Sequence, residues 1–229
     1  MNISSQQAIE DIIAGKFYPK LVLWGYCNGI FPMADDNDNI IWFCPYRRGI
    51  IELKQFAIPR TLRATIRKKK FKVFTNTDFE TVIKTCADRG ETWISSKIID
   101  CYIDLHKSGY AHSVETYNFE NQLVGGLYGV AIGGAFFGES MFHLQKDASK
   151  VALVALVSHL RKQKFSLLDT QWLTAHLARM GGSEITRSEY LIRLKQTLDK
   201  QCNFVEKERK TIEIEIDKNL FSKNRTYCE

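Results

Sequence analysis

Hydrophobic and polar positions recur with two different periods along the chain, and each period predicts one kind of element. Near the N-terminus, residues 5–14 and 18–28 have the spacing of helices. Ile40–Phe43 and Gly49–Leu53 are short apolar runs with the length of strands. We therefore predict a small N-terminal α/β domain over residues 1–58.

A longer region, residues 59–200, shows both periods in turn. The expected helices are 59–70, opened by Pro59, then 78–87, 95–108, 147–162 with Asp147 or Ser149 as cap, 171–180 and 188–199. The expected strands are Phe71–Thr75, His112–Tyr117, Leu123–Val130, Gly133–Gly138, Ser166–Asp169 and Glu184–Thr186. The fold class is therefore α+β, with helices packed on a mixed sheet. Residues 201–229 form a polar extension, in which the alternating run Thr211–Asp217 is either an edge strand or part of a tail.

The basic residues are concentrated in one segment. Between Arg60 and Lys72 the chain has seven basic residues and no acidic one, whereas the remaining residues comprise 25 basic and 26 acidic side chains. The net charge of +6 therefore comes from this segment. On the expected helix, Arg60, Arg63 and Arg67 share one face. Such a patch favours contact with a nucleic acid, and a merely solvated helix face is the alternative.

Composition indicates a globular protein with a packed core. Hydrophobic residues make up 45% of the 229 positions and charged residues 25%. No apolar run approaches the roughly 18 residues of a membrane span, and the first residues do not resemble a secretory signal. The six cysteines have no zinc-like spacing. We expect reduced thiols, no metal, no membrane contact and a cytoplasmic location.

The first candidate for chemistry is a glycine-rich hairpin followed by a carboxylate. Five glycines fall between Gly125 and Gly134 in otherwise apolar strands. Glycine in a strand costs backbone entropy, so this density indicates a bulge, a strongly twisted hairpin, or a ligand close to the backbone. Glu139 follows in an apolar strand. Because an isolated buried charge is unfavourable, its carboxylate is either paired or functional.

The second candidate lies at the end of another apolar strand. Asp169 and Gln171 are two residues apart, so their side chains can point the same way and come within hydrogen-bonding distance. The alternative is that Asp169 or Thr170 only caps the following helix. We do not assign His176, on that helix, as a base.

These segments also carry a resemblance to a known family. The chain resembles the leucyl/phenylalanyl-tRNA–protein transferases in successive blocks that occur in family order over about residues 18–195: Gly29-Ile-Phe-Pro, Thr92-Trp-Ile, His112-Ser-Val-Glu, Leu123-Val-Gly-Gly-Leu-Tyr-Gly-Val, Phe137-Gly-Glu-Ser-Met-Phe, Asp147-Ala-Ser-Lys and Leu168-Asp-Thr-Gln. The resemblance implies an acetyltransferase-like (GNAT) fold for the larger domain. It also implies transfer of Leu, Phe or Met from aminoacyl-tRNA to proteins that begin with Arg or Lys, a tag for N-end-rule degradation.

The resemblance also implies roles for individual residues. Asp169 and Gln171 match the family's catalytic pair, and Glu139 matches its acidic residue at the peptide-acceptor site. Gln171, polarised by Asp169, would either relay a proton from the acceptor amine or only position that amine. No cofactor is required, because an aminoacyl ester is already activated. The family's apolar donor pocket corresponds to Trp93, Leu127, Phe136, Leu156, Leu160 and Leu168, and its tRNA-binding cluster to Arg60, Arg63, Arg67, Lys68, Lys69 and Lys70.

Three features depart from the family pattern. Met33 stands where the family usually has Trp, and we expect it to alter the pocket and the preference among Leu, Phe and Met. The Gly-Gly-Asp-Leu segment that usually precedes Tyr18 is absent, and residues 201–229 have no counterpart.

Two other functions compete with the transferase. An acetyl-CoA-dependent acetyltransferase would share the fold, but Lys146-Asp-Ala-Ser-Lys occupies the place of its pyrophosphate loop. A catalytically silent tRNA-binding module would keep the basic helix, but it would not need Glu139, Asp169 and Gln171. No self-association pattern is evident, so we expect a monomer.

Overall fold

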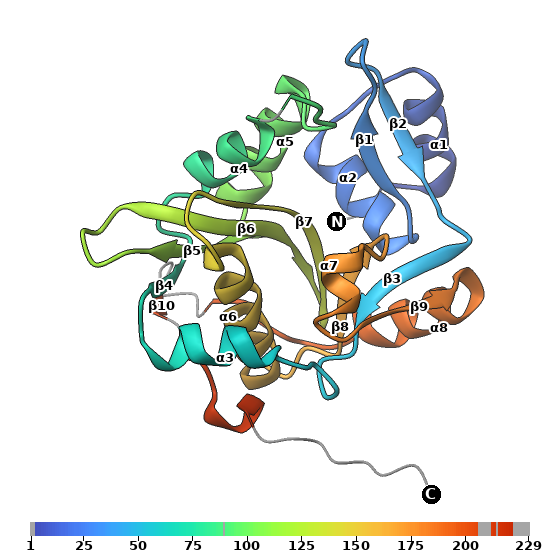
Figure 1. The fold of residues 1–229 in the computed structure, drawn as a ribbon. Helices are drawn as coiled ribbons and strands as arrows, with labels where there is room; N and C mark the ends of the chain where they lie inside the picture. Colours follow the sequence, from blue (N-terminus) through green and yellow to red (C-terminus); the bar gives the residue numbers. More distant parts are fainter. Residues whose placement is uncertain (1–2, 89, 206–211, 214, 222–229) are drawn as a thin grey trace, which may run out of the picture.

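An eight-stranded mixed sheet forms the centre of the molecule (Figure 1). The computed structural model describes residues 3–88, 90–205, 212–213 and 215–221. The strand order is β10-β4-β5-β6-β7-β8-β3-β9, and all neighbours are antiparallel except β7 and β8, which are parallel. A separate two-stranded sheet pairs β1 with β2. The strands are β1 Phe31–Ala34, β2 Ile40–Phe43, β3 Arg47–Ile51, β4 Lys72–Thr75, β5 Ala111–Tyr117, β6 Leu123–Ile132, β7 Ala135–His143, β8 Leu167–Gln171, β9 Gly182–Thr186 and β10 Ile212–Glu213.

Helices cover both faces of the sheet. One apolar cluster joins α2, α4, α5 and α8 to the first face, and a second joins α3, α6 and the end of α7 to the opposite face. Within the described ranges, no helix is long and apolar enough to cross a membrane. The helices are α1 Ser5–Ile13, α2 Pro19–Cys27, α3 Arg60–Arg67, α4 Phe79–Ala87, α5 Ser96–Lys107, α6 Ala148–Lys162, α7 Ala175–Ala178, α8 Arg187–Leu198 and the 3₁₀ turn η1 Lys218–Phe221.

The predicted α+β class, with a small N-terminal unit and a mixed sheet, is confirmed. The parallel β7–β8 pair in an otherwise antiparallel sheet agrees with the acetyltransferase-like architecture that the resemblance implies. The division at residues 58 and 200 stays a prediction. β3 precedes the first of these boundaries, yet it pairs with both β8 and β9 inside the large sheet.

The β7 and β8 strands pair over a short stretch and then part. Their register runs from Ala135 opposite Leu167 to Phe137 opposite Asp169. Beyond that point β7 continues to His143 along β6 alone. The glycine-rich hairpin contains a bulge, one of the expected alternatives, between Tyr128 and Gly129. A Cβ added at Gly129 would lie 2.2 Å from the Phe137 carbonyl oxygen. Close packing of β6 on β7 thus accounts for this glycine without a ligand.

Three sequence-based elements differ from the structure. The expected helix 171–180 is wrong: β8 runs on to Gln171, and Thr174 caps a helix of only four residues, α7. The strand expected at Gly133–Gly138 begins later, because Gly133 takes a positive φ of 57° and forms the turn between β6 and β7. Pro59 is the N-cap of α3, and the helix ends at Arg67.

The C-terminal extension is part of the core where it is described. Phe204 is 3% exposed, and its ring lies against the rings of His112, Phe136, His159 and Phe165. Its carbonyl oxygen is 2.6 Å from His159 Nε2. Further on, β10 pairs with β4, which confirms the edge-strand alternative for residues 212–213.

Replacing Phe204 with alanine should therefore destabilise the whole fold. Loss of a buried aromatic ring lowers the free energy of unfolding by about 3–5 kcal/mol. Urea unfolding measures this change, with Phe119→Ala as the control because Phe119 is 69% exposed in a hairpin turn. Equal midpoints for the two variants would show that the extension is dispensable for stability.

Candidate active site

An apolar cavity of about 290 Å³ opens where β7 and β8 part. The strand separation removes a row of backbone hydrogen bonds from one edge of β7 and leaves room beside it. Glu139, the second residue beyond the paired stretch of β7, and Gln171, the last residue of β8, both line the cavity. Two of the three catalytic candidates, on different strands, therefore meet at one opening.

Asp169 lies beneath this opening in a buried ion pair that the sequence did not reveal. Arg48 Nη2 donates to Asp169 Oδ2 at 2.6 Å, and Arg48 Nε donates to Oδ1 at 2.9 Å. The two side chains are 1% and 0% exposed. Tyr190 donates a further hydrogen bond to Oδ2 at 2.6 Å. Asp169 is thus a fully paired carboxylate, and its alternative role as a helix cap is excluded.

Arg48 is held as closely as its partner. Its Nη1 donates to the Gly29 carbonyl at 3.1 Å, and its guanidinium carbon lies 4.5 Å from the ring centroids of both Phe31 and Tyr190. Burial by itself would lower the pKa of Arg48, but the adjacent Asp169 carboxylate raises it. The guanidinium therefore stays charged, because desolvation is offset by a bidentate partner.

The sequence contained a weak signal for Arg48. Strand alternation places Arg48 on the same side as Ile50, whose side chain is buried. Because the neighbouring Ile51 is also apolar, the sequence alone does not show which side of the strand is buried. The backbone adds a second constraint at Gly49. A Cβ there would lie 2.6 Å from the Trp172 carbonyl carbon, so only glycine lets β3 pass the end of β8.

The end of β8 turns sharply to present the Gln171 side chain. Its backbone has φ 62°, a left-handed conformation that costs free energy for a residue other than glycine. The Gln171 backbone N–H donates to Asp169 Oδ1 at 2.8 Å, which stabilises this turn. The expected contact between the Asp169 carboxylate and the Gln171 amide is therefore made through the backbone. Asp169 acts on the turn rather than on the side-chain oxygen.

The Gln171 side chain is oriented by Glu139. Its Nε2 donates to Glu139 Oε1 at 2.9 Å. Because a carboxylate accepts hydrogen bonds, this contact assigns the amide nitrogen to Glu139 and leaves the amide oxygen as an acceptor for another group. Among the described residues, that oxygen accepts no hydrogen bond in the structure.

Glu139 is surrounded by hydroxyl and amide groups rather than by a cation. Tyr26 donates to its Oε1 at 2.6 Å, the Tyr102 hydroxyl lies 3.3 Å from its Oε2, and the two phenol oxygens lie within hydrogen-bonding distance of each other. The pKa of Glu139 is raised to about 7: burial raises it most, the hydrogen bond from Tyr26 lowers it, and the nearby Asp169 charge raises it. Glu139 is therefore the carboxyl group of the site that changes charge near neutral pH.

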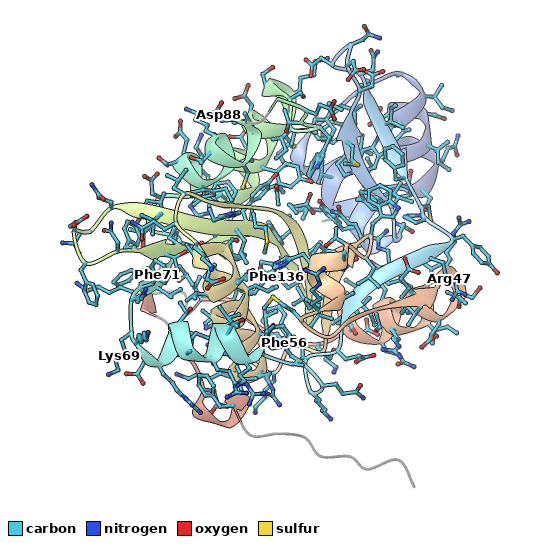
Figure 2. The ribbon with its side chains drawn as sticks, viewed as in Figure 1. Arg47, Phe56, Lys69, Phe71, Asp88 and Phe136 are labelled. Atoms are coloured by element: carbon cyan, nitrogen blue, oxygen red, sulfur yellow. The ribbon has the colours of Figure 1, made fainter. Side chains whose placement is uncertain are left out.

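Most of the expected donor-pocket residues line the cavity. They are Met33, Trp93, Leu127, Leu156 and Leu168. Phe136 and Leu160 do not; both are fully buried in the core, and Figure 2 shows Phe136 near the centre of the molecule. The cavity is also lined by Met141, Leu153 and Trp172, which no sequence pattern marked as pocket residues. Trp172 is 39% exposed and packs edge-on against Phe31 and Phe43, so it forms part of the rim.

The expected tRNA-binding cluster divides into two groups. Arg60, Arg67, Lys68, Lys69 and Lys70 are exposed, and Figure 2 shows Lys69 at the outer edge beside α3. Arg63 instead is half-buried and donates to the carbonyl oxygens of Ile58 and Phe221 at 2.9 and 3.1 Å. Arg63 therefore anchors the extension to α3.

Among the described residues, no group of three His, Cys, Asp or Glu side chains is placed to hold a metal ion. The chemistry that these residues offer is hydrogen bonding and charge. The opening combines an apolar cavity with the Gln171 amide oxygen and with the adjacent Glu139 carboxyl group, whose pKa is raised.

Replacing Arg48 with methionine should strongly destabilise the protein. The variant leaves Asp169 buried without its cation, and breaking a buried pair in this way costs about 3–5 kcal/mol. Urea unfolding tests this, with Arg47→Met as a matched control because Arg47 is exposed on the same strand. Adding Asp169→Met should recover part of the loss, since no unpaired charge then remains. An equal loss of unfolding free energy in Arg48→Met and Arg47→Met would contradict the stabilising role of the Arg48–Asp169 pair.

Glu139→Gln should change how stability depends on pH. The pKa of Glu139 rises from 4.5 to about 7 in the folded protein, so the native state binds a proton more tightly than the unfolded chain. The wild-type free energy of unfolding must then fall as pH rises from 4.5 to 7 through this group. The variant cannot bind this proton, so its free energy of unfolding relative to that of wild type should increase between pH 4.5 and 7. Parallel curves from urea unfolding at several pH values would refute the raised pKa.

Comparisons with known proteins show which family the chain belongs to. The family model described as leucyl/phenylalanyl-tRNA protein transferase matches residues 50–195, and the model of that family's N-terminal domain matches residues 15–45. A leucyl/phenylalanyl-tRNA–protein transferase of Ruegeria sp. (strain TM1040) is 48% identical over 187 residues, covering 81% of this chain and 89% of the relative. One of Chlorobaculum parvum is 47% identical over 189 residues, covering 80% and 97%. The chain therefore belongs to the leucyl/phenylalanyl-tRNA–protein transferase family and is an aminoacyltransferase.

Proposed function

We propose that this enzyme transfers Leu, Phe or Met from aminoacyl-tRNA to the N-terminal Arg or Lys of acceptor proteins. The observation that carries this proposal is the cavity at the β7–β8 opening, which joins an apolar wall to Glu139 and Gln171. Because aminoacyl-tRNA is a cytoplasmic substrate, the reaction belongs in the cytoplasm, where the product would be marked for N-end-rule degradation. The monomeric state stays a prediction.

The reaction needs an amine, an ester and a path for one proton. The acceptor's neutral α-amine attacks the ester carbonyl carbon, a C–N bond forms, and the C–O bond to the terminal ribose breaks. The ribose oxygen leaves as a hydroxyl, taking up the proton that the amine loses. Gln171 is suited to orient the amine, since its amide oxygen is available and its nitrogen is held by Glu139. An amide is a poor base, so we assign Gln171 to positioning and not to proton abstraction.

The apolar wall is suited to the donor side chain. Leu127, Leu156 and Leu168 face the cavity from the sheet and α6, and the missed residues Met141 and Leu153 extend the same surface. An apolar pocket discriminates by fit, with about 1–3 kcal/mol for each methylene. Met33 is narrower and more flexible than the Trp usual in the family, so this wall can accommodate Phe and Met beside Leu.

The charge of Glu139 suits the acceptor. Above a pH of about 7 its carboxylate is ionised, and a cationic N-terminal residue would supply the positive partner that the described part of the chain does not give it. Asp169 does not compete for this role, because Arg48 already neutralises it.

The exposed basic residues of α3 and the following turn suit the tRNA body. Five uncompensated positive side chains, Arg60, Arg67, Lys68, Lys69 and Lys70, can contact phosphates. A silent tRNA-binding module would use the same surface, but it would not need Gln171 in a left-handed conformation that costs free energy.

The proposal is tested by a transfer assay with Gln171→Ala. Wild-type protein should move Leu, Phe and Met from charged tRNA to peptides beginning with Arg or Lys, but not to those beginning with Asp or Glu. The variant should bind charged tRNA as wild type does and lose at least about 100-fold in transfer rate, as when one positioned polar group is removed from an active site.

Gln55→Ala, a substitution of an exposed glutamine, is the control and should transfer at the wild-type rate. If wild type binds tRNA and modifies no peptide, the binding-module alternative replaces the enzyme. Transfer only to Asp or Glu peptides would mean that Glu139 does not select the acceptor.

A further inference from the structure

A second group of basic side chains lies beside the mouth of the cavity, apart from the α3 patch. His176, on α7, lines the cavity. Burial lowers the pKa of His176, and electrostatic interaction with Lys150, Arg179 and His143 lowers it further. Lys146 lies beside Asp147 at the start of α6. We call these residues the mouth cluster: His143, Lys146, Lys150, His176 and Arg179.

The mouth cluster is joined to α3 by direct contacts. Lys150 Nζ donates to Asp147 Oδ1 at 3.0 Å, and Thr65, on α3, donates to Asp147 Oδ2 at 3.1 Å. α3 and α7 pack with α6 on the same face of the sheet (Figure 1). These contacts join α3 to the start of α6, and the electrostatic interaction between Lys150 and the cavity-lining His176 continues the surface to the cavity.

This surface carries excess positive charge. Arg179 and Lys146 are exposed, and Lys150 keeps 38% of its side chain exposed. The Asp147 carboxylate pairs with Lys150 and interacts electrostatically with Lys146, so it offsets one of these three fixed charges. The lowered pKa of His176 leaves its ring neutral near pH 7, so it can donate or accept a hydrogen bond at the mouth.

We propose that the mouth cluster binds the phosphates of the single-stranded 3′ end of aminoacyl-tRNA. This inference rests on the proposed function, because it takes the cavity as the site of the aminoacyl ester. That ester is attached to the last ribose of the tRNA, so the preceding phosphodiesters must leave the cavity through its mouth. The double-stranded part of the tRNA then lies over α3. The mouth cluster is the positive surface between these two points.

Shortened donors separate the two basic surfaces. Leucyl-tRNA presents the double helix and the 3′ end, a leucylated CCA trinucleotide presents only the last phosphodiesters, and 3′-leucyl-adenosine presents none. For each variant, the ratio of kcat/KM with the trinucleotide to kcat/KM with the adenosine donor measures the phosphate contacts at the mouth. Losses of activity that have other causes cancel in this ratio.

Arg179→Gln and Lys150→Gln should each lower this ratio by about two- to fivefold, the range of one exposed ionic contact. The salt dependence of kcat/KM with the trinucleotide should also flatten by about 0.7 in logarithmic slope for each lost phosphate contact. Lys69→Gln, in the turn after α3, should weaken only the reaction with leucyl-tRNA and leave the ratio unchanged. Lys107→Gln, which alters an exposed lysine on α5, is the matched control.

An unchanged ratio in Arg179→Gln and Lys150→Gln would overturn the proposal, whether the two donors lose activity equally or not at all. A binding measurement that needs no transfer reaction makes the test independent of catalysis. Wild type should bind an RNA minihelix ending in CCA more tightly than the same minihelix without that end, and Arg179→Gln should reduce the difference. If this difference is found but no peptide is modified, the proposed function is wrong, whereas binding of the 3′ end by the mouth cluster is supported. If transfer occurs but the difference is absent, only the proposed binding of the 3′ end by the mouth cluster is wrong.

Discussion

The buried contact between Arg48 and Asp169 is the interaction on which the rest of the site depends. It joins β3 to β8, and through Gly29 and Tyr190 it also joins the turn after α2 and the helix α8. A charge placed so deep is tolerated only when its hydrogen-bonding groups are satisfied, and this requirement selects one register of the strands. Because Asp169 then accepts the Gln171 backbone N–H, the same pair holds the left-handed turn that presents Gln171 to the cavity.

Two carboxylates lie in this site, and their surroundings give them different properties. Asp169 has a guanidinium partner and stays a fixed part of the scaffold. Glu139 has two phenols and an amide around it, and burial raises its pKa to about 7. Among the described residues Glu139 has no cationic partner, which is why we propose it, and not Asp169, as the group that meets a cationic acceptor. This division of roles follows from the environment, since the two side chains have the same chemistry.

The positive charge of the protein is likewise divided by its contacts. Arg63 belongs to the basic segment, but its guanidinium is bound to two carbonyl oxygens, one of them from the C-terminal extension. The neighbouring Arg67 lies over the ring of Phe221. The extension therefore packs against α3 from one side and inserts Phe204 into the core from the other. A segment beyond the family match of residues 50–195 is thus integrated into the fold that presents the basic surface.

Local pattern determined much of this protein. The α1, α2, α4, α5 and β2 elements lie within a residue or two of their predicted bounds, because each has a clear period or apolar run. The family blocks brought Glu139, Asp169 and Gln171 forward as site residues, and basic residues without acidic neighbours marked the segment after Pro59. Tertiary structure decided the rest. The helix expected at 171–180 was lost because Gln171 had to extend β8 and turn toward Glu139. Arg48 acquired its role because β3 lies beside β8, and Phe136 lies in the core because Phe204 covers it. A local pattern records which side of an element is buried, whereas these outcomes depend on which distant segment covers that side.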